Sequence, residues 1–267
     1  MTTTSTNSAR GDQPQSTSSA ASRVLGAVVL AGLGLLVVLG LIISPADRIQ
    51  GDAVRIMYVH VPSAITAYLA FAVTAVGSIA YLWKRSRWWD LMAAAAAEIG
   101  VVFTATTLIT GMIWGNLTWG AYWVWDARLT STALLFVLFI GYLAVRSIPA
   151  DRATRAKRSA VVGIIAFLDV PIVHFSVDWW RGQHQPATLS RLDPTIDGLM
   201  LFTMVFGMAV FALGFGWLLL HGFRVKWLTE QDESVGLEEA ILERRSAAGS
   251  PHDQSQPADA IIDRSAP

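Results

Sequence analysis

Six long apolar stretches, separated by short charged segments, constrain this chain more than any other feature. A helix needs about 20 apolar residues to cross the hydrocarbon core of a bilayer. The stretches that meet or approach this length are Val24–Ile43, 60–83, 92–113, Leu129–Val145, 160–177 and Gly198–Leu220. We therefore expect an all-α integral membrane protein, folded as a six-transmembrane-helix bundle.

The composition excludes several other classes of protein. Hydrophobic residues make up 53% of the 267 positions and charged residues only 15%, against about 25% charged in a typical soluble domain. The 20 basic residues balance the 20 acidic ones, so a nucleic-acid binder that works through bulk charge is excluded. Because the chain has no cysteine, it cannot form disulfides, thiolate metal sites or thioether bonds to haem.

The basic residues predict the orientation of the bundle. An even number of spans places both ends of the chain on one side. The segments on that side hold 12 basic residues before the distal tail: Arg10, Arg23, Lys84, Arg85, Arg87, Arg146, Arg152, Arg155, Lys157, Arg158, Arg224 and Lys226. The opposite segments hold five: Arg48, Arg55, Arg128, Arg181 and Arg191. Because basic loops stay in the cytoplasm, we expect both termini to be cytoplasmic.

Polar tails flank the membrane domain, which we place at residues 24–222. Residues 1–23 are rich in Ser, Thr and Gln and should form a disordered cytoplasmic tail. The first apolar stretch is too long for the core of a cleaved signal peptide, so we expect a retained helix. The tail 223–267 should be cytoplasmic and largely disordered, with a short helix near Glu233–Arg245.

Tryptophans concentrate in the outer segments, above all in residues 114–130, the tryptophan segment. It contains Trp114, Trp119, Trp123 and Trp125. Part of this pattern is the aromatic belt of membrane interfaces. However, four Trp and one Tyr within 12 residues also suit a platform for a large flat ligand such as a porphyrin. Both interpretations remain open on composition alone.

Two charged residues of the tryptophan segment, Asp126 and Arg128, have structural and functional interpretations. Asp126 directly precedes the fourth span, where an Asp is a good helix N-cap. Arg128 could pair with Asp126, or its guanidinium could receive a ligand carboxylate such as a haem propionate.

Histidines are the candidate metal ligands. The chain contains His60, His174, His184, His221 and His252. In the expected topology His60 opens the second span and His184 follows the fifth, so both face the side of the tryptophan segment. Two imidazoles from different segments could supply both axial positions of a haem iron.

His174, with Asp169 deeper in the fifth span, is the competing candidate ligand. Ionisable groups inside a membrane are costly and are usually functional or paired. A structural polar cluster that satisfies backbone groups freed by Pro171 is the alternative.

Some chemistry is absent from the sequence. It has no His-Glu-x-x-His zinc motif, no Gly-x-Ser-x-Gly nucleophile and no Walker A motif. Any ATP-driven step would therefore need another subunit.

Three motifs carry a resemblance to a known family. Residues 123–130 read Trp-Val-Trp-Asp-Ala-Arg-Leu-Thr, 57–62 read Met-Tyr-Val-His-Val-Pro, and 171–180, which end in Val-Asp-Trp-Trp, precede His184. In this order and spacing they resemble the haem-handling (WWD-domain) membrane proteins of cytochrome c biogenesis, most closely the CcmC (haem exporter protein C) family. The similarity covers residues 24–222.

The resemblance implies a cofactor-delivery protein of the bacterial inner membrane rather than an enzyme. Such proteins bind haem b at the periplasmic face and pass it to the haem chaperone CcmE. They work in a complex with the small subunit CcmD and the ATP-binding cassette subunits CcmA and CcmB. By motif position, His60 and His184 would be the axial iron ligands. The porphyrin would contact Trp114, Trp119, Trp123 and Trp125, together with Asp126 and Arg128.

Two other functions were weighed against haem delivery. A membrane haem b redox anchor, which passes electrons to quinone, predicts histidine pairs buried within helices, and only His174 fits. A solute permease predicts broken helices with polar groups near the midplane, and Asp169-Val170-Pro171 is the one such feature.

Overall fold

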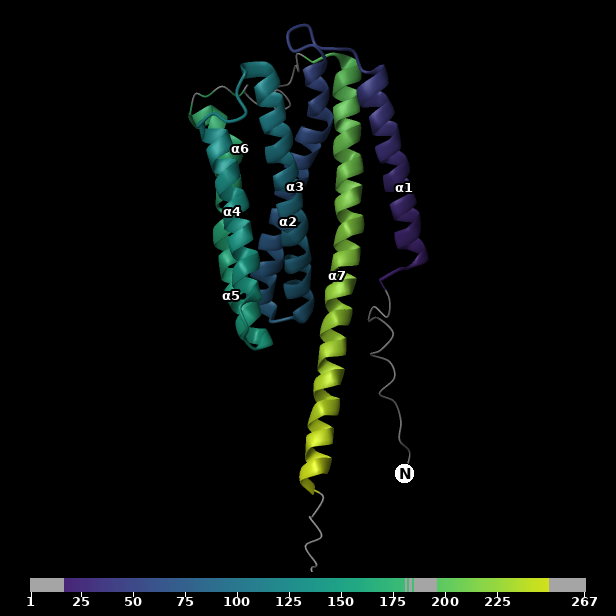
Figure 1. Ribbon diagram of the computed structural model, residues 1–267, viewed down its shortest axis with the longest axis vertical. Coiled ribbons are helices and arrows are strands. Elements are labelled where there is room, and N and C mark those ends of the chain that lie inside the picture. Colours follow the sequence, from purple (N-terminus) through teal and green to yellow (C-terminus); the bar gives the residue numbers. More distant parts are fainter. Residues whose placement is uncertain (1–16, 181, 183, 185–195, 250–267) are drawn as a thin grey trace, which may run out of the picture. The chain divides into compact units, whose positions relative to one another are not determined.

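A computed structural model describes residues 17–180, 182, 184 and 196–249, and its regular elements in these ranges are all helices (Figure 1). They are α1 (Ala20–Val37), which continues as the π-helical turn η1 (Val38–Ile43), the 3-10 helix η2 (Asp52–Ile56), α2 (Met57–Lys84), α3 (Arg87–Trp119), α4 (Ala127–Ser147), α5 (Arg152–Phe167), α6 (Asp169–Trp179) and α7 (Gly198–Gly249). His252, Arg181 and Gln183 lie outside the described residues.

The predicted number of spans is confirmed. Among the described residues, six helical segments are long and apolar enough to cross a membrane: Ala20–Ile43, Asp52–Lys84, Arg87–Trp119, Ala127–Ser147, Arg152–Trp179 and Gly198–Ser246. These helices extend beyond the predicted apolar stretches, because helical hydrogen bonding continues into the polar ends of each span.

The fifth span consists of two helices rather than the single helix we expected. Helix α5 ends at Phe167, Leu168 forms a turn, and α6 begins at Asp169. Pro171 explains the break, because its ring clashes with the carbonyl four positions earlier and it has no N–H to donate. The side chain of Asp169 is buried at this break.

Local sequence signals set the other helix ends near the outer face. Helix α3 ends at Gly120, whose φ of 74° suits a residue without a Cβ. Helix α4 begins after Asp126, whose side chain accepts a hydrogen bond from the backbone N–H of Leu129. The expected N-cap role of Asp126 is thus confirmed. Because α3 ends at Trp119 and α4 begins at Ala127, Trp114 and Trp119 lie on the last turns of α3, and residues 120–126 form the loop between the two helices.

Small residues allow the central helices to pack closely. The alanines 93–97 of α3 are buried, with Ala93 against Gly77 of α2 and Ala95 against Gly222 of α7. A Cβ on Gly100 would lie 2.4 Å from the ring of Phe71. That ring stacks on Phe139 of α4 at 3.6 Å between centroids. In a bilayer, where apolar burial favours helix contact little, such close packing is what holds helices together.

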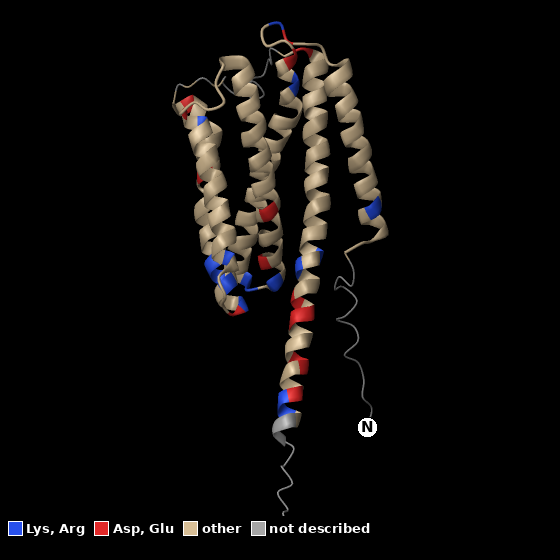
Figure 2. Ribbon diagram, in the orientation of Figure 1, with Lys and Arg blue, Asp and Glu red and all other residues tan. Residues whose placement is uncertain are grey.

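Most of the lysines and arginines of the membrane-spanning unit, which ends at Trp227, gather at one end. Figure 2 shows blue Lys and Arg ribbons where α2 joins α3 and where α4 joins α5. There Asp90 and Arg146 form two hydrogen bonds of 2.6 and 2.8 Å. This distribution agrees with the positive-inside argument, and the cytoplasmic location of the termini stays a prediction.

The carboxyl-terminal unit, from Leu228 on, is more helical than expected. Instead of a short helix near Glu233–Arg245, α7 continues to Gly249. The reason is local, since residues 228–246 contain no proline and many good helix formers such as Glu, Leu, Ala and Arg.

Candidate functional site

The predicted ligand residues come together at the end of the bundle opposite the basic loops. This end is formed by the start of α2, the end of α3 and the loop 120–126 (Figure 1), and the described residues Gly182 and His184 lie against that loop and α3. His60 and His184 lie close enough for their charges to interact, and Arg128 acts electrostatically on both. Two imidazoles from distant parts of the sequence therefore share one site.

His60 lies in the first turn of α2 and packs against α3. Its Nδ1 lies 3.1 Å from the hydroxyl oxygen of Thr110. A Cβ on Gly111 would lie 2.9 Å from the imidazole, so only glycine leaves room for the ring. The ring of Trp114 meets the imidazole edge-on at 5.7 Å, and its N–H donates to Gln50 at 2.7 Å. Thr110 and Trp114, on one face of α3, thus both contact the His60 imidazole.

His184 is held by a carboxylate instead. Its Nδ1 lies 2.5 Å from Oδ2 of Asp126, whose side chain is only 6% exposed. The other oxygen, Oδ1, accepts from Leu129 N–H at 2.8 Å. Trp119 meets the His184 ring edge-on at 5.0 Å. Gly182 lies directly beside Asp126, where an added Cβ would be 3.2 Å from Oδ2.

The environment of His184 favours its neutral form. Burial lowers the pKa of His184, and this effect outweighs the hydrogen bond and the charge of Asp126, which raise it. A neutral imidazole keeps one nitrogen lone pair, which is the form that binds a metal.

The four tryptophans of the segment divide into two pairs. Trp114 and Trp119 each contact one of the two candidate ligands, which a simple interfacial belt does not require. Trp123 and Trp125 contact each other edge-on at 5.4 Å. Trp125 is 82% exposed, whereas the indole nitrogen of Trp123 is buried and has no partner among the described residues.

Arg128 does not pair with Asp126, as one interpretation of the sequence suggested. Arg128 donates to the backbone oxygen of His174 at 3.2 Å, whereas Asp126 binds His184. The charge of the Arg128 guanidinium acts on the imidazoles of His60 and His184, and a guanidinium can bind a ligand carboxylate.

The imidazole of His174 contacts other aromatic rings than the tryptophans that border His60 and His184. Its ring contacts Tyr68 at 6.2 Å and Phe175 at 4.8 Å, both edge-on. Below it, Asp169 is buried, and its Oδ2 has no hydrogen-bond partner among the described residues. That this part of the fifth span forms a structural polar cluster, which satisfies backbone groups freed by Pro171, stays a prediction.

Several site residues escaped the sequence analysis, namely Gln50, Thr110, Gly111 and Gly182. Thr110 and Gly111 lie inside an apolar span in which threonines and glycines are common. Their spacing from Trp114, three and four residues, places all three on one helical face. That pattern was available, but only the structure reveals that His60 packs there.

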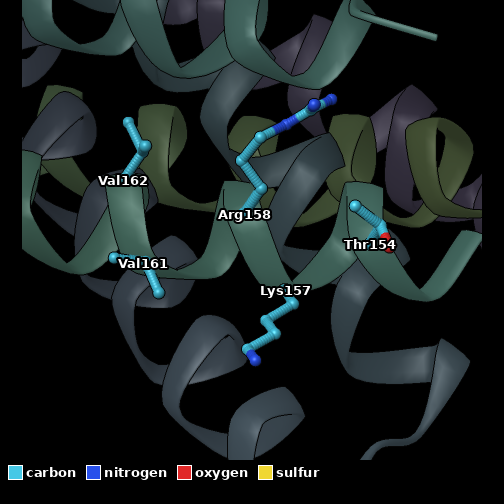
Figure 3. A pocket seen from close by; sticks show the side chains of 5 residues that line it. All are labelled: Thr154, Lys157, Arg158, Val161 and Val162. Atoms are coloured by element: carbon cyan, nitrogen blue, oxygen red, sulfur yellow. The ribbon is translucent and has the colours of Figure 1, made fainter. Parts of the chain in front are cut away.

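Two surface hollows lie away from the two candidate ligands. One, of about 470 Å³, is lined by Thr154, Lys157, Arg158, Val161 and Val162 on α5 (Figure 3). It is an open hollow, and Lys157 and Arg158 extend away from each other (Figure 3). Among the described residues, no group of three or more His, Asp or Glu could hold a bare metal ion. A haem, whose porphyrin supplies four nitrogens, needs only axial ligands from the protein.

Comparison with known proteins identifies the relatives of this chain. A model of the "Heme exporter protein C" family matches residues 7–237. A heme exporter protein C of Haemophilus influenzae is 40% identical over 204 residues, 76% of this chain and 82% of its own. That of Bradyrhizobium diazoefficiens is 36% identical over 74% of this chain and 76% of its own, and that of Escherichia coli K12 is 36% identical over 75% and 81%.

Proposed function

Because the chain belongs to the heme exporter protein C family, we propose that it binds haem b at the outer end of its helices and delivers it to the haem chaperone CcmE. The family supports a role in haem export for cytochrome c maturation. One observation carries the proposal for the site. Two imidazoles from separate segments lie close enough for their charges to interact, and each is bordered by a tryptophan of the segment 114–130.

In this proposal His60 and His184 are the two axial ligands of the iron. Each imidazole uses Nδ1 for a hydrogen bond within the protein, which leaves Nε2 for the metal. Bis-histidine ligation holds b-type haem iron without any covalent bond to the porphyrin, consistent with a chain that lacks cysteine.

The remaining predicted residues would bind the porphyrin itself. Trp114 and Trp119 border the imidazoles, and Trp123 and Trp125 extend this aromatic surface outward. Ring contacts of this kind contribute about 0.5–1.5 kcal/mol per pair beyond their buried area. The guanidinium of Arg128, whose charge acts on both histidines, would bind a propionate.

An open site suits delivery better than a deep one. Trp119 and Trp125 are exposed, and the His184 side chain is 20% exposed. A chaperone could therefore reach one edge of the porphyrin and replace one axial histidine with a ligand of its own. The chain would act as a haem-delivery protein and not as an enzyme.

The wider assembly follows from the same proposal. Haem loading and release would involve the small subunit CcmD and the ATP-binding cassette subunits CcmA and CcmB. The chain itself carries no Walker A motif. The protein would be a multi-pass protein of the inner membrane, with its haem site facing the periplasm.

Histidine variants test the site directly. The full chain, co-expressed with its partners and purified in detergent, should show a b-type absorption spectrum and a positive pyridine haemochrome assay. We expect His60→Ala and His184→Ala each to lose most of the bound haem, because each removes one iron ligand. His174→Ala should retain it, since its ring lies among Tyr68 and Phe175.

Other outcomes would favour the rival functions. Haem lost only with His174→Ala would move the iron into the membrane and support the redox anchor. A chain without haem, even beside its partners, would end the haem proposal. The break between α5 and α6, with Asp169 buried there, would then justify transport assays for a permease.

A further inference from the structure

The hydrogen bonds of the two histidines define which nitrogen carries the proton. The hydroxyl of Thr110 has one proton, and it donates this proton to the backbone oxygen of Thr106 at 2.7 Å. Its oxygen can therefore only accept from His60, so Nδ1 of His60 is the N–H nitrogen. The carboxylate of Asp126 can only accept as well, so Nδ1 of His184 also carries the proton.

The geometry assigns Thr110 and Asp126 as positioning residues that hold both histidines in the Nδ1–H tautomer, with both Nε2 lone pairs available to the iron. This inference rests on the proposed function and adds the residues that make it possible. Metal-binding histidines generally donate their second ring nitrogen to a carboxylate or another acceptor, which fixes the ring and its tautomer. Neither residue needs to touch the haem to act in this way.

Asp126 is itself fixed by the fold. Oδ1 caps α4 through Leu129 N–H, while Oδ2 accepts from His184. One carboxylate thus connects the ligand to the first turn of a membrane-spanning helix. The two ligands also differ, because a charged acceptor makes His184 a stronger electron donor than His60, whose acceptor is a neutral hydroxyl.

Asp126→Asn tests this role with little change in shape. The amide oxygen must remain on Leu129 to keep the cap, so the amide nitrogen, a donor, would face His184 Nδ1. The imidazole must then become the Nε2–H tautomer, which has no lone pair for iron. We expect about 10- to 100-fold weaker haem binding and a change from a six-coordinate low-spin to a five-coordinate high-spin ferric spectrum.

Added imidazole should restore the low-spin spectrum of Asp126→Asn, since it occupies the vacated axial position. Asp151→Asn is the matched control. Asp151 caps α5 by accepting from Thr154 N–H at 3.0 Å, and it is remote from the histidines in sequence. This control should bind haem like the unchanged protein. If Asp126→Asn does not fold, Asp126→Ser keeps a good N-cap without a carboxylate for His184.

Thr110→Val tests the second positioning residue. Valine has the shape of threonine, and it removes the hydroxyl that accepts the His60 proton together with the bonds of that hydroxyl to backbone oxygens of α3. We expect about 10-fold weaker haem binding. Thr106→Val is its control, because the Thr106 hydroxyl donates to Val102 one turn away and meets no histidine.

The outcomes separate this inference from the proposed function. If the unchanged protein is low-spin and His184→Ala is high-spin, but Asp126→Asn and Asp126→Ser match the unchanged protein, Asp126 does not position the ligand. Likewise, wild-type affinity and spectrum in Thr110→Val would overturn its role. If the unchanged protein binds no haem, or His184→Ala stays low-spin with full haem, the axial assignment itself fails.

Discussion

At the scale of single residues, the site depends on side chains that do not themselves contact a ligand. Gly111 shows this most simply, because its missing Cβ leaves the space that the His60 imidazole fills. The same helix face supplies the hydroxyl of Thr110 and the ring of Trp114. A substitution on this face should therefore change the site while the fold remains.

Gly111→Ala should displace the imidazole, because the new Cβ would lie 2.9 Å from the ring. The ring can move more easily than the helix backbone, so we expect the hydrogen bond to Thr110 to be lost. Haem affinity should then fall by about 10-fold or more, at an unchanged temperature of unfolding in detergent. Gly141→Ala is the control, since an added Cβ there meets nothing within 4 Å, and it should bind haem normally.

At the scale of helices, ion pairs near the basic end of the bundle connect elements that are otherwise held by apolar contacts. Asp90 at the start of α3 pairs with Arg146 at the end of α4; Asp90 is buried and Arg146 is mostly covered, with side-chain exposures of 5% and 12%. Glu98 of α3 pairs with Lys226 of α7, but Glu98 is half exposed. Burial should make these two pairs differ in their effect on stability.

Asp90→Asn should lower the free energy of unfolding by about 3 kcal/mol, because it leaves the buried guanidinium of Arg146 without its carboxylate. The double variant Asp90→Asn, Arg146→Met should lose less than the two single variants added together. Glu98→Gln, which breaks the exposed pair, should cost less than about 1 kcal/mol. Unfolding in detergent, followed by circular dichroism, would measure the free energy of unfolding of these variants and of Arg146→Met alone. Equal losses of stability on breaking the two pairs would contradict the argument.

At the scale of the whole molecule, the distribution of basic residues predicts its orientation. The loops between α2 and α3 and between α4 and α5 are basic, whereas the site lies at the opposite end (Figure 2). In the cytoplasmic membrane of a bacterium, this arrangement would place the site on the periplasmic face. A periplasmic chaperone could then reach it.

Cysteine accessibility would test this orientation, and the chain has no native cysteine to remove. Ile49, in the loop before η2, and Ile148, between α4 and α5, are both exposed. A membrane-impermeant maleimide should label Ile49→Cys once the outer membrane is permeable. It should label Ile148→Cys only after the inner membrane is opened. The reverse pattern would place the site in the cytoplasm and exclude delivery to a periplasmic chaperone.

Local features of the sequence were sufficient for the architecture and for part of the site. A membrane span depends on about 20 neighbouring residues, so the six spans could be predicted from composition along the chain. The break at Leu168 was not expected as two helices, although Pro171 is its cause. The motif positions brought His60, His184 and the tryptophan segment to attention, and the structure places them together.

Only the tertiary structure decided which residues far apart in the sequence contact each other. Nothing near His60 indicates Thr110 or Gly111 as its neighbours, and Asp126 looked like a helix cap that could pair with Arg128. Which partner a side chain meets depends on which helix faces pack together, and local composition does not carry this information. The sequence by itself therefore determined a six-helix membrane protein with two candidate ligands. The packing of α2 on α3, and the contact of His184 with the N-cap residue of α4, determined how each ligand is held.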